Sequence, residues 1–165
     1  MNARSSMMVA RSGEAVYIRI NGPGNMKICP TLQDFAKRMI VEGYKKFIVD
    51  LEECSTMDST FMGTMVEIAS MAPPLTESLM IINPQEHCEG LLEGLGLDNV
   101  LRVKQEQIDL PVVELEPLPE YAVGQNERMR LIRRAHENLI KADKRNDEKF
   151  GPFLRQLIKE MGKML

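Results

Sequence analysis

Short apolar runs alternate with segments of helical period through the first 104 residues, and this alternation limits the fold more than any other feature. Residues 15–20 are rich in β-branched side chains, and residues 46–51, 78–82 and 100–103 form further short apolar runs. Runs of this kind are typical of strands covered on both faces. The connections are too long for hairpins, so the sequence predicts an α/β fold with a mixed, mainly parallel sheet covered by helices.

Three helices are expected between these strands, and each has a start signal. Thr31 begins a weak capping box, Asp58 or Ser59 can cap the second helix, and Asn83 offers an N-cap before a proline. Residues 52–57 are interpreted as a connecting loop. The expected helices are 31–43, about 60–71, and a third that ends near Gly94 or Gly96.

The last third of the chain has a different character. Residues 108–121 contain three prolines and no helical period, which indicates an extended linker. Residues 125–142 and 146–164 are amphipathic and predict a helical hairpin. Residues 125–165 carry 11 Lys and Arg against 6 Asp and Glu, whereas residues 1–124 carry 10 against 18. We therefore expect the hairpin to pack back on the rest of the chain, which hides its apolar faces and pairs opposite charges.

Composition argues against several functional classes. No segment approaches the roughly 18 apolar residues of a membrane span, and the first twenty residues lack the apolar core of a signal peptide, so we expect a cytoplasmic protein. The basic C-terminal part has interleaved acidic residues and the chain has no Trp, which favours a solvated face over direct nucleic-acid binding.

The chain also offers little for catalysis or metal binding. Its three cysteines are widely spaced and are interpreted as reduced, and His87 with Cys88 is the best metal pair among its few candidates. There is no glycine-rich phosphate loop, and no His or Lys lies close in sequence to the carboxylates that follow residue 51. We expect neither an enzyme nor a metal or cofactor.

One segment resembles a known family. The run Ile48-Val-Asp-Leu-Glu-Glu-Cys-Ser-Thr-Met-Asp-Ser-Thr-Phe-Met-Gly-Thr64 is similar to the STAS signature, in which a strand ending in Asp-Leu is followed by Asp-Ser-Ser/Thr-Gly-Leu-Gly at a helix start. Residues 16–22 look like the first long strand and turn of that family, and 79–103 like its final strand, helix and strand. The resemblance covers about residues 8–106 and implies a STAS domain of the anti-sigma factor antagonist type.

The resemblance implies a regulatory site. By motif position Ser59 is the phosphoacceptor, supported by Asp58 and Thr60. An unphosphorylated antagonist binds an anti-sigma factor or related serine kinase, phosphorylation releases it, and a serine phosphatase resets it. The sequence departs from the family pattern, since Phe61-Met62 replaces Gly-Leu, and Asn25 stands where many antagonists have Asp.

A second apolar stripe on the helix that follows Ser59 has two interpretations. Phe61, Thr64 and Ile68 lie on a different side from the stripe expected to face the sheet. They are either buried beneath the C-terminal hairpin or form a face for partner docking. The candidate partner-binding residues are Asn25, Phe61, Met62, Thr64 and Ile68.

The predicted organisation is a STAS domain at 1–106, a Pro-rich linker at 107–124 and an amphipathic helical extension at 125–165. The expected function is partner switching controlled by Ser59, with a homodimer possible. The alternative is a scaffold, or a small-molecule or lipid-binding STAS module, whose output is not sigma-factor release.

Overall fold

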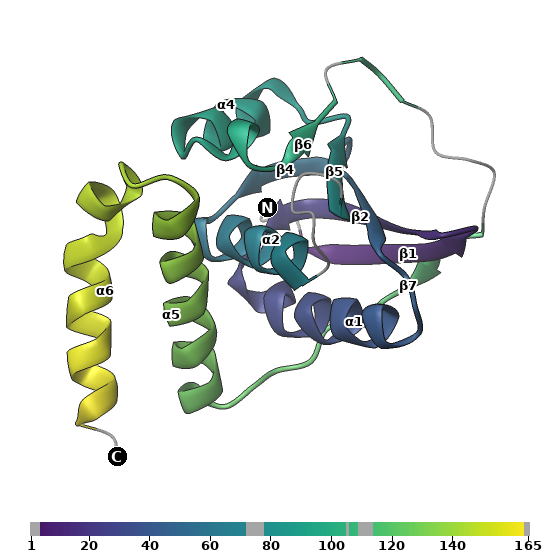
Figure 1. The fold of residues 1–165 in the computed structure, drawn as a ribbon. Helices are drawn as coiled ribbons and strands as arrows, with labels where there is room; N and C mark the ends of the chain where they lie inside the picture. The colour runs from purple at the N-terminus through teal and green to yellow at the C-terminus, as the bar shows by residue number, and fades with distance from the viewer. Residues whose placement is uncertain (1–3, 72–77, 105, 109–113, 164–165) are drawn as a thin grey trace.

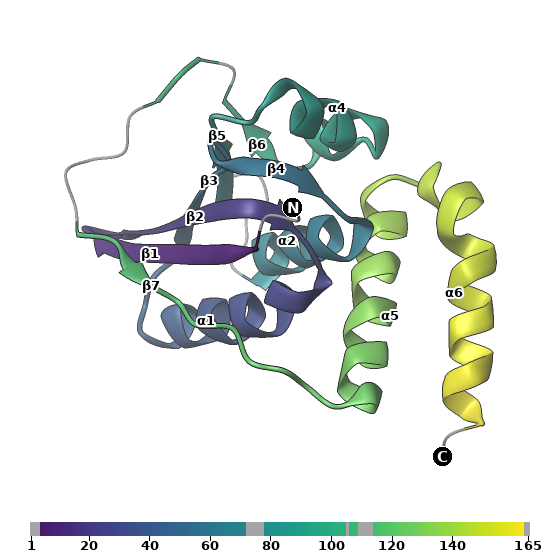
Figure 2. The same cartoon turned by 180° about the vertical axis from the view of Figure 1, so that it is seen from behind.

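The computed structural model describes residues 4–71, 78–104, 106–108 and 114–163. Its sheet has the strand order β6-β5-β3-β2-β1-β7, with β4 paired to β2 beyond the end of β3. Figures 1 and 2 show α1 (Cys29–Val41) and α2 (Ser59–Met71) side by side over one face of the sheet. They show α5 (Gln125–Ala142) against α2, and α6 (Asn146–Gly162) outermost. The strands are β1 Ser6–Ser12, β2 Ala15–Gly24, β3 Lys46–Asp50, β4 Cys54–Met57, β5 Leu79–Ile82, β6 Arg102–Val103 and β7 Glu116–Pro117.

The parallel part of the sheet is the part that the sequence predicts. β2, β3, β5 and β6 pair in parallel, with Ile18 opposite Val49 and Val49 opposite Ile81. Side chains on the face beneath α1 and α2 fill the core, whereas Tyr17, Ile48 and Met80 on the opposite face are only half-buried. The apolar runs predict strands covered on both faces, and that part of the prediction is wrong. The predicted α/β class, with a mainly parallel sheet, covering helices and a C-terminal helical hairpin, is confirmed.

Three strands were not predicted. β1 pairs antiparallel with β2 through a turn at Gly13, whose φ of 61° suits glycine. β4 lies in the segment interpreted as a loop, and it pairs with β2 at Gly22 and Gly24. β7 lies within the predicted linker and pairs with β1. β7 is a two-residue strand at the sheet edge and β4 pairs with the glycine-rich end of β2, where periodicity gives little signal.

Two of the expected N-caps, Thr31 and Asn83, do not cap their helices. α1 (Cys29–Val41) starts before Thr31, whose hydroxyl accepts a hydrogen bond from the Tyr121 amide instead. α4 (Glu86–Gly94) has Gln85 as its N-cap. Asn83 has a φ of 54°, and its amide group bonds the Asp50 carboxylate and both backbone polar groups of Ile108. α2 is Ser59–Met71, and the two short 3-10 helices are η1 (Met26–Ile28) and η2 (Leu97–Asn99).

The core lies between the sheet and its covering helices. Fully buried side chains come from β2, β3, β5 and α2 in particular. They include Val16, Ile18, Ile20, Phe47, Phe61, Met65, Ile68, Leu79 and Ile81. The helix α2 therefore belongs to the core and also carries the candidate site at its first turn.

The C-terminal helices agree with the predicted hairpin. α5 spans Gln125–Ala142 and α6 spans Asn146–Gly162. The Asn146 side chain donates to the carbonyls of Leu95 and Leu139, so it fixes the turn between the two helices against the segment after α4. Within the part of the chain that the structure describes, no helix has both the length and the apolar character needed to cross a bilayer.

Candidate functional site

Ser59 is the first residue of α2, and Asp58 fixes the start of that helix. One oxygen of the Asp58 carboxylate accepts a hydrogen bond from the Phe61 amide at 2.8 Å, and the other accepts from the Met26 amide at 2.9 Å. The Asp58 amide donates to the carbonyl of Gly24 at 2.9 Å. Asp58 is therefore the N-cap, one of the two alternatives that the sequence left open, and it joins α2 to the end of β2 and to η1.

The Ser59 hydroxyl contacts a histidine from the C-terminal helices. Ser59 Oγ lies 2.9 Å from Nε2 of His136, whose Nδ1 lies 2.8 Å from the carbonyl oxygen of Ile132. Because a carbonyl only accepts, Nδ1 carries a proton, and in the tautomer with its single proton on Nδ1 the Nε2 atom accepts the hydrogen bond from Ser59. The orientation of the Ser59 hydroxyl is thus set by α5.

His136 is itself held by aromatic side chains of α6. Its ring centroid lies 5.1 Å from that of Phe150 and 5.0 Å from that of Phe153, and the residue is 4% exposed. The sequence did not predict the contact between Ser59 and His136, which lie 77 residues apart. One signal was present, since His136 lies near Ala135 and Leu139 on the apolar side of an amphipathic helix, where a polar residue needs a partner.

Further contacts join α5 to the same helix. Gly63 packs directly against the backbone of Ala135, and a Cβ atom at Gly63 would overlap the Ala135 carbonyl group. One turn further along, the Glu67 carboxylate accepts hydrogen bonds from Arg134 Nε at 3.3 Å and from Gln33 Nε2 at 2.8 Å. Ser59, Gly63 and Glu67 therefore form one face of α2, and α5 covers it.

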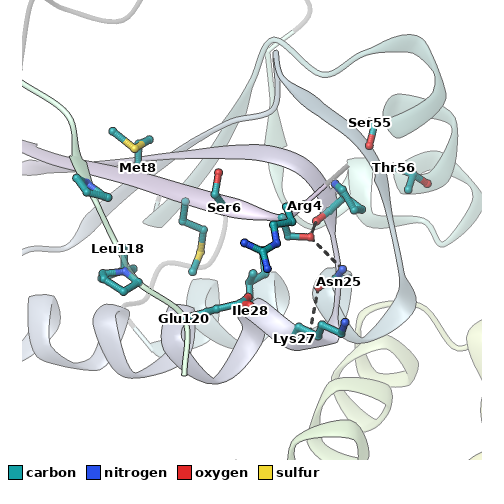
Figure 3. Close-up of a pocket in the computed structure, with 15 residues that line it drawn as sticks. Arg4, Ser6, Met8, Asn25, Lys27, Ile28, Ser55, Thr56, Leu118 and Glu120 are labelled. Carbon is teal, nitrogen blue, oxygen red and sulfur yellow. Dashed lines mark hydrogen bonds between the residues drawn. The ribbon is translucent and has the colours of Figure 1, made fainter. Parts of the chain in front are cut away.

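Asn25 lies at the surface beside this site. Its side-chain oxygen accepts from the Lys27 amide at 3.1 Å, and its nitrogen donates to the Ser5 hydroxyl at 3.0 Å. It lines an open cavity of about 1100 Å³. Figure 3 shows Arg4, Asn25 and Lys27 gathered at one end of this cavity, with Met8 and Leu118 at the other.

The second apolar stripe of α2 is buried. Phe61, Met62, Thr64 and Ile68 are 0%, 4%, 0% and 1% exposed, respectively. Phe61 packs on Gly24, and the Thr64 hydroxyl donates to the carbonyl of Thr60, whose residue is also buried. Of the two interpretations, burial is what the structure shows, although the cover at Phe61 is β2 and not the C-terminal hairpin. A partner role for these side chains would require them to become exposed.

The cysteines are buried, and the two histidines serve hydrogen bonds. Burial raises the pKa of Cys29 to about 12, against a weaker opposing effect of the Thr64 hydroxyl. A hydrogen bond with Cys88, together with burial, raises the pKa of Cys54. His87 Nε2 lies 2.9 Å from the Thr56 hydroxyl. No group of three or more metal-binding side chains is assembled among the residues that the structure describes.

The chain is similar in sequence to one protein family and in fold to several solved structures. A sequence model of the STAS domain matches residues 6–109. A solved structure of a candidate anti-sigma factor antagonist from Thermotoga maritima has a TM-score of 0.53 at 19% identity, and the match covers 58% of this chain and 82% of that one. Unphosphorylated SpoIIAA, an anti-sigma factor antagonist of Bacillus, has a TM-score of 0.54 at 18% identity, with 61% and 89% covered. No curated protein matches the chain closely enough to count as a relative.

Proposed function

Because the chain belongs to the STAS domain family, we propose that it is the antagonist element of a partner switch. It binds an anti-sigma factor or a related serine kinase while Ser59 is unphosphorylated, and phosphorylation of Ser59 breaks the complex. A serine phosphatase returns it to the binding state. In this role the protein is a regulator and not an enzyme.

The position of Ser59 at the start of α2 is the observation that carries this proposal. The first N–H groups of a helix have no partner within the helix, and the macrodipole is positive at that end. A phosphate on the first residue of a 13-residue helix is therefore electrostatically favourable in the free protein. Since Asp58 already satisfies the Phe61 amide, the phosphate does not have to replace the cap for the helix to persist.

The same phosphate disfavours a bound partner. It adds about −1.5 to −2 charges beside the exposed Asp58. A partner docked over Asp58 and Asn25 would have to supply a cation or bury an unpaired charge, which costs several kcal/mol, or about a hundredfold or more in affinity. Ser59 and Asp58, with Thr60 as the following hydroxyl residue, form the proposed phosphorylation site, and Asn25 is the proposed contact from the neighbouring loop.

The cavity beside Asn25 supports the alternative of a small-molecule or scaffold function. It is lined by Arg4, Lys27 and Glu120 together with several hydroxyl groups, so it could accept a polar ligand or a segment of a partner. The two functions differ in whether the protein keeps its partner when residue 59 becomes negatively charged. A scaffold would hold its partner whatever the charge at residue 59.

Affinity capture with the full chain tests the switch. We expect the wild type and Ser59→Ala to retain a serine kinase that Ser59→Asp loses, with an affinity difference of about a hundredfold or more. Ser70→Asp is the matched control, because it adds the same charge to an exposed serine near the other end of α2 and should bind normally. With ATP, the captured kinase should modify Ser59 as located by peptide mass spectrometry.

Two results would contradict the proposal. In the first, Ser59→Asp binds each captured protein as tightly as the wild type does, which would favour the scaffold function. In the second, the kinase modifies Thr56 or Thr60 and Ser59→Ala is still released by ATP. Either result leaves the family membership intact and removes the assignment of Ser59.

A further inference from the structure

The helices α5 and α6 lie outside the part of the chain that matches the family, residues 6–109. Even so, α5 contacts α2 along the face that carries Ser59 (Figure 2). We propose that α5 is an intramolecular mask, so that a kinase reaches Ser59 only in molecules whose α5 has left α2. This inference rests on the proposed phosphorylation of Ser59 and concerns how that site is regulated.

The contact at Ser59 is what makes α5 a mask and not a distant appendage. The Ser59 hydroxyl is hydrogen-bonded to Nε2 of His136 on α5, and Ser59 is only partly exposed. Phosphoryl transfer needs the acceptor oxygen in line with the donor, inside a site that excludes water. A kinase that surrounds Ser59 would meet His136, and behind it the rings of Phe150 and Phe153.

The attachment of α5 is suited to reversible release. Four of its 18 residues are buried, namely Leu131, Ala135, His136 and Leu139. By comparison, nine of the 13 residues of α2 are buried. An element with a smaller buried fraction than the core helix opens at lower free energy than the core does, so in this proposal α5 leaves while the sheet stays folded.

Gly63 offers a way to displace α5 by one methyl group. A Cβ atom at this position would lie 2.8 Å from Cα of Ala135 and would overlap its carbonyl group, so Gly63→Ala should push α5 away from α2. The substitution favours the helical state of α2 itself, because Ala is a better helix former than Gly. Gly90→Ala is the matched control, since Gly90 lies in α4 with no atom within 4 Å of the added methyl group.

A thiol at residue 59 reports on the mask without requiring the kinase. The native cysteines, Cys29, Cys54 and Cys88, are each 0% exposed, so Ser59→Cys adds a selective site for iodoacetamide. Alkylation is measured in the full chain at a pH at which this thiol is ionised in each variant. We expect Gly63→Ala to raise its rate by about tenfold or more, as for a locally opened segment, and Gly90→Ala to leave it unchanged.

Hydrogen exchange in the same variants locates the change. Gly63→Ala should speed exchange across residues 125–163 while β2, β3 and β5 remain protected. If α5 exchanges quickly but the alkylation rate is that of the Gly90→Ala control, Ser59 is not masked and the proposal is wrong. If α5 is protected and Ser59→Cys is still alkylated as fast as Ser70→Cys, at an exposed position of the same helix, the seated helix does not shield residue 59, which also overturns the proposal.

A second pair of variants applies if Gly63→Ala does not fold. Arg134 contacts Glu67 on α2 and Gln33 on α1, whereas Arg133 pairs with Glu137 on its own helix. Arg134→Ala should therefore raise the alkylation rate about two- to fivefold, in line with the loss of a modest ion pair, and Arg133→Ala should not. The absence of that difference would count against the mask.

The kinase obtained by affinity capture separates this inference from the proposed function. If that kinase modifies wild type and Gly63→Ala at equal rates, the mask is wrong while the switch stands. If no kinase is captured but the alkylation results hold, the mask stands and the proposed partner is wrong.

Discussion

The sheet and the C-terminal helices are held in place by different means. In the sheet, the apolar side chains of β2, β3 and β5 that face α1 and α2 are almost completely buried. In contrast, α5 buries a narrow stripe and adds polar contacts at Ser59 and Glu67. The proposed mask depends on this contrast, because it requires α5 to separate from α2 while the sheet stays folded.

The largest expected effect concerns the sheet. Asp50 is 1% exposed at the end of β3, and its carboxylate accepts hydrogen bonds from Arg19 at 3.2 Å and from the Glu52 amide at 3.0 Å. Asp50→Ala leaves these donors and the Asn83 amide without that acceptor. We expect the free energy of unfolding in urea to fall by about 1 to 3 kcal/mol, the cost of leaving buried donors without an acceptor.

The control for that substitution is an exposed ion pair. Arg11 and Glu42 lie 3.0 Å apart with both side chains about half exposed. Glu42→Ala should lower the free energy of unfolding by about 0 to 1 kcal/mol. If Asp50→Ala destabilised the protein no more than Glu42→Ala, the buried network would not support the sheet as described.

An intermediate effect is expected where the two regions meet. A double-mutant cycle with Ser59→Ala and His136→Ala isolates their hydrogen bond from the aromatic packing of His136. The measured quantity is the free energy of local opening of α5 from hydrogen exchange. We expect a coupling of about 0.5 to 1.5 kcal/mol.

The Thr56–His87 pair provides the comparison for this cycle. It has the same 2.9 Å separation but joins β4 to α4, away from α5. The corresponding cycle with Thr56→Ala and His87→Ala should show no coupling in the opening of α5. Zero coupling between Ser59 and His136 would mean that their contact does not hold the helix in place.

The smallest expected effect lies at the turn between α5 and α6. A hydrogen bond from Arg145 lowers the pKa of Asp143 from 3.8 to about 2. A pKa that is lower in the folded state stabilises this turn above about pH 4, and the contribution is lost as the pH falls towards 2. The protection factors of the turn amides, which correct for the intrinsic pH dependence of exchange, should therefore fall between pH 4 and 2 in the wild type. Asp143→Asn should show no such step, and a step that persists in this variant would assign the titration to another group.

Periodicity and start signals predicted the elements that depend on local sequence. The apolar run at 46–51 predicts β3 because short apolar runs are typical of strands, although Ile48 on the second face of β3 is only half-buried. Asp58 was recognisable as one of two possible caps because a carboxylate before a helix bonds its first amides. The same logic failed at Asn83, where tertiary hydrogen bonds to Asp50 and Ile108 outcompete helix capping.

The candidate site was predictable only in part. Motif position selected Ser59, but nothing local to Ser59 indicates His136, because the contact depends on where α5 crosses α2. Gly63 carries the clearest trace of that crossing, since a glycine inside a helix often marks a close approach of another backbone. The stripe of Phe61, Thr64 and Ile68 was ambiguous because helical spacing gives its direction but not what covers it.

Tyr121 anchors the chain just before α5, and this anchor determines how strongly α5 competes with a partner for the same face of α2. The Tyr121 amide donates to Thr31 on α1, and residues 122–124 alone separate Tyr121 from the first residue of α5. A chain that short spans at most about 14 Å, which keeps the released helix at an effective concentration in the millimolar range or above. A partner that needs the same face therefore binds with an apparent dissociation constant equal to its intrinsic value divided by the open fraction. A longer segment between Tyr121 and α5 would lower the effective concentration of the released helix, and a partner would then bind more readily, with no residue between α2 and α5 changed.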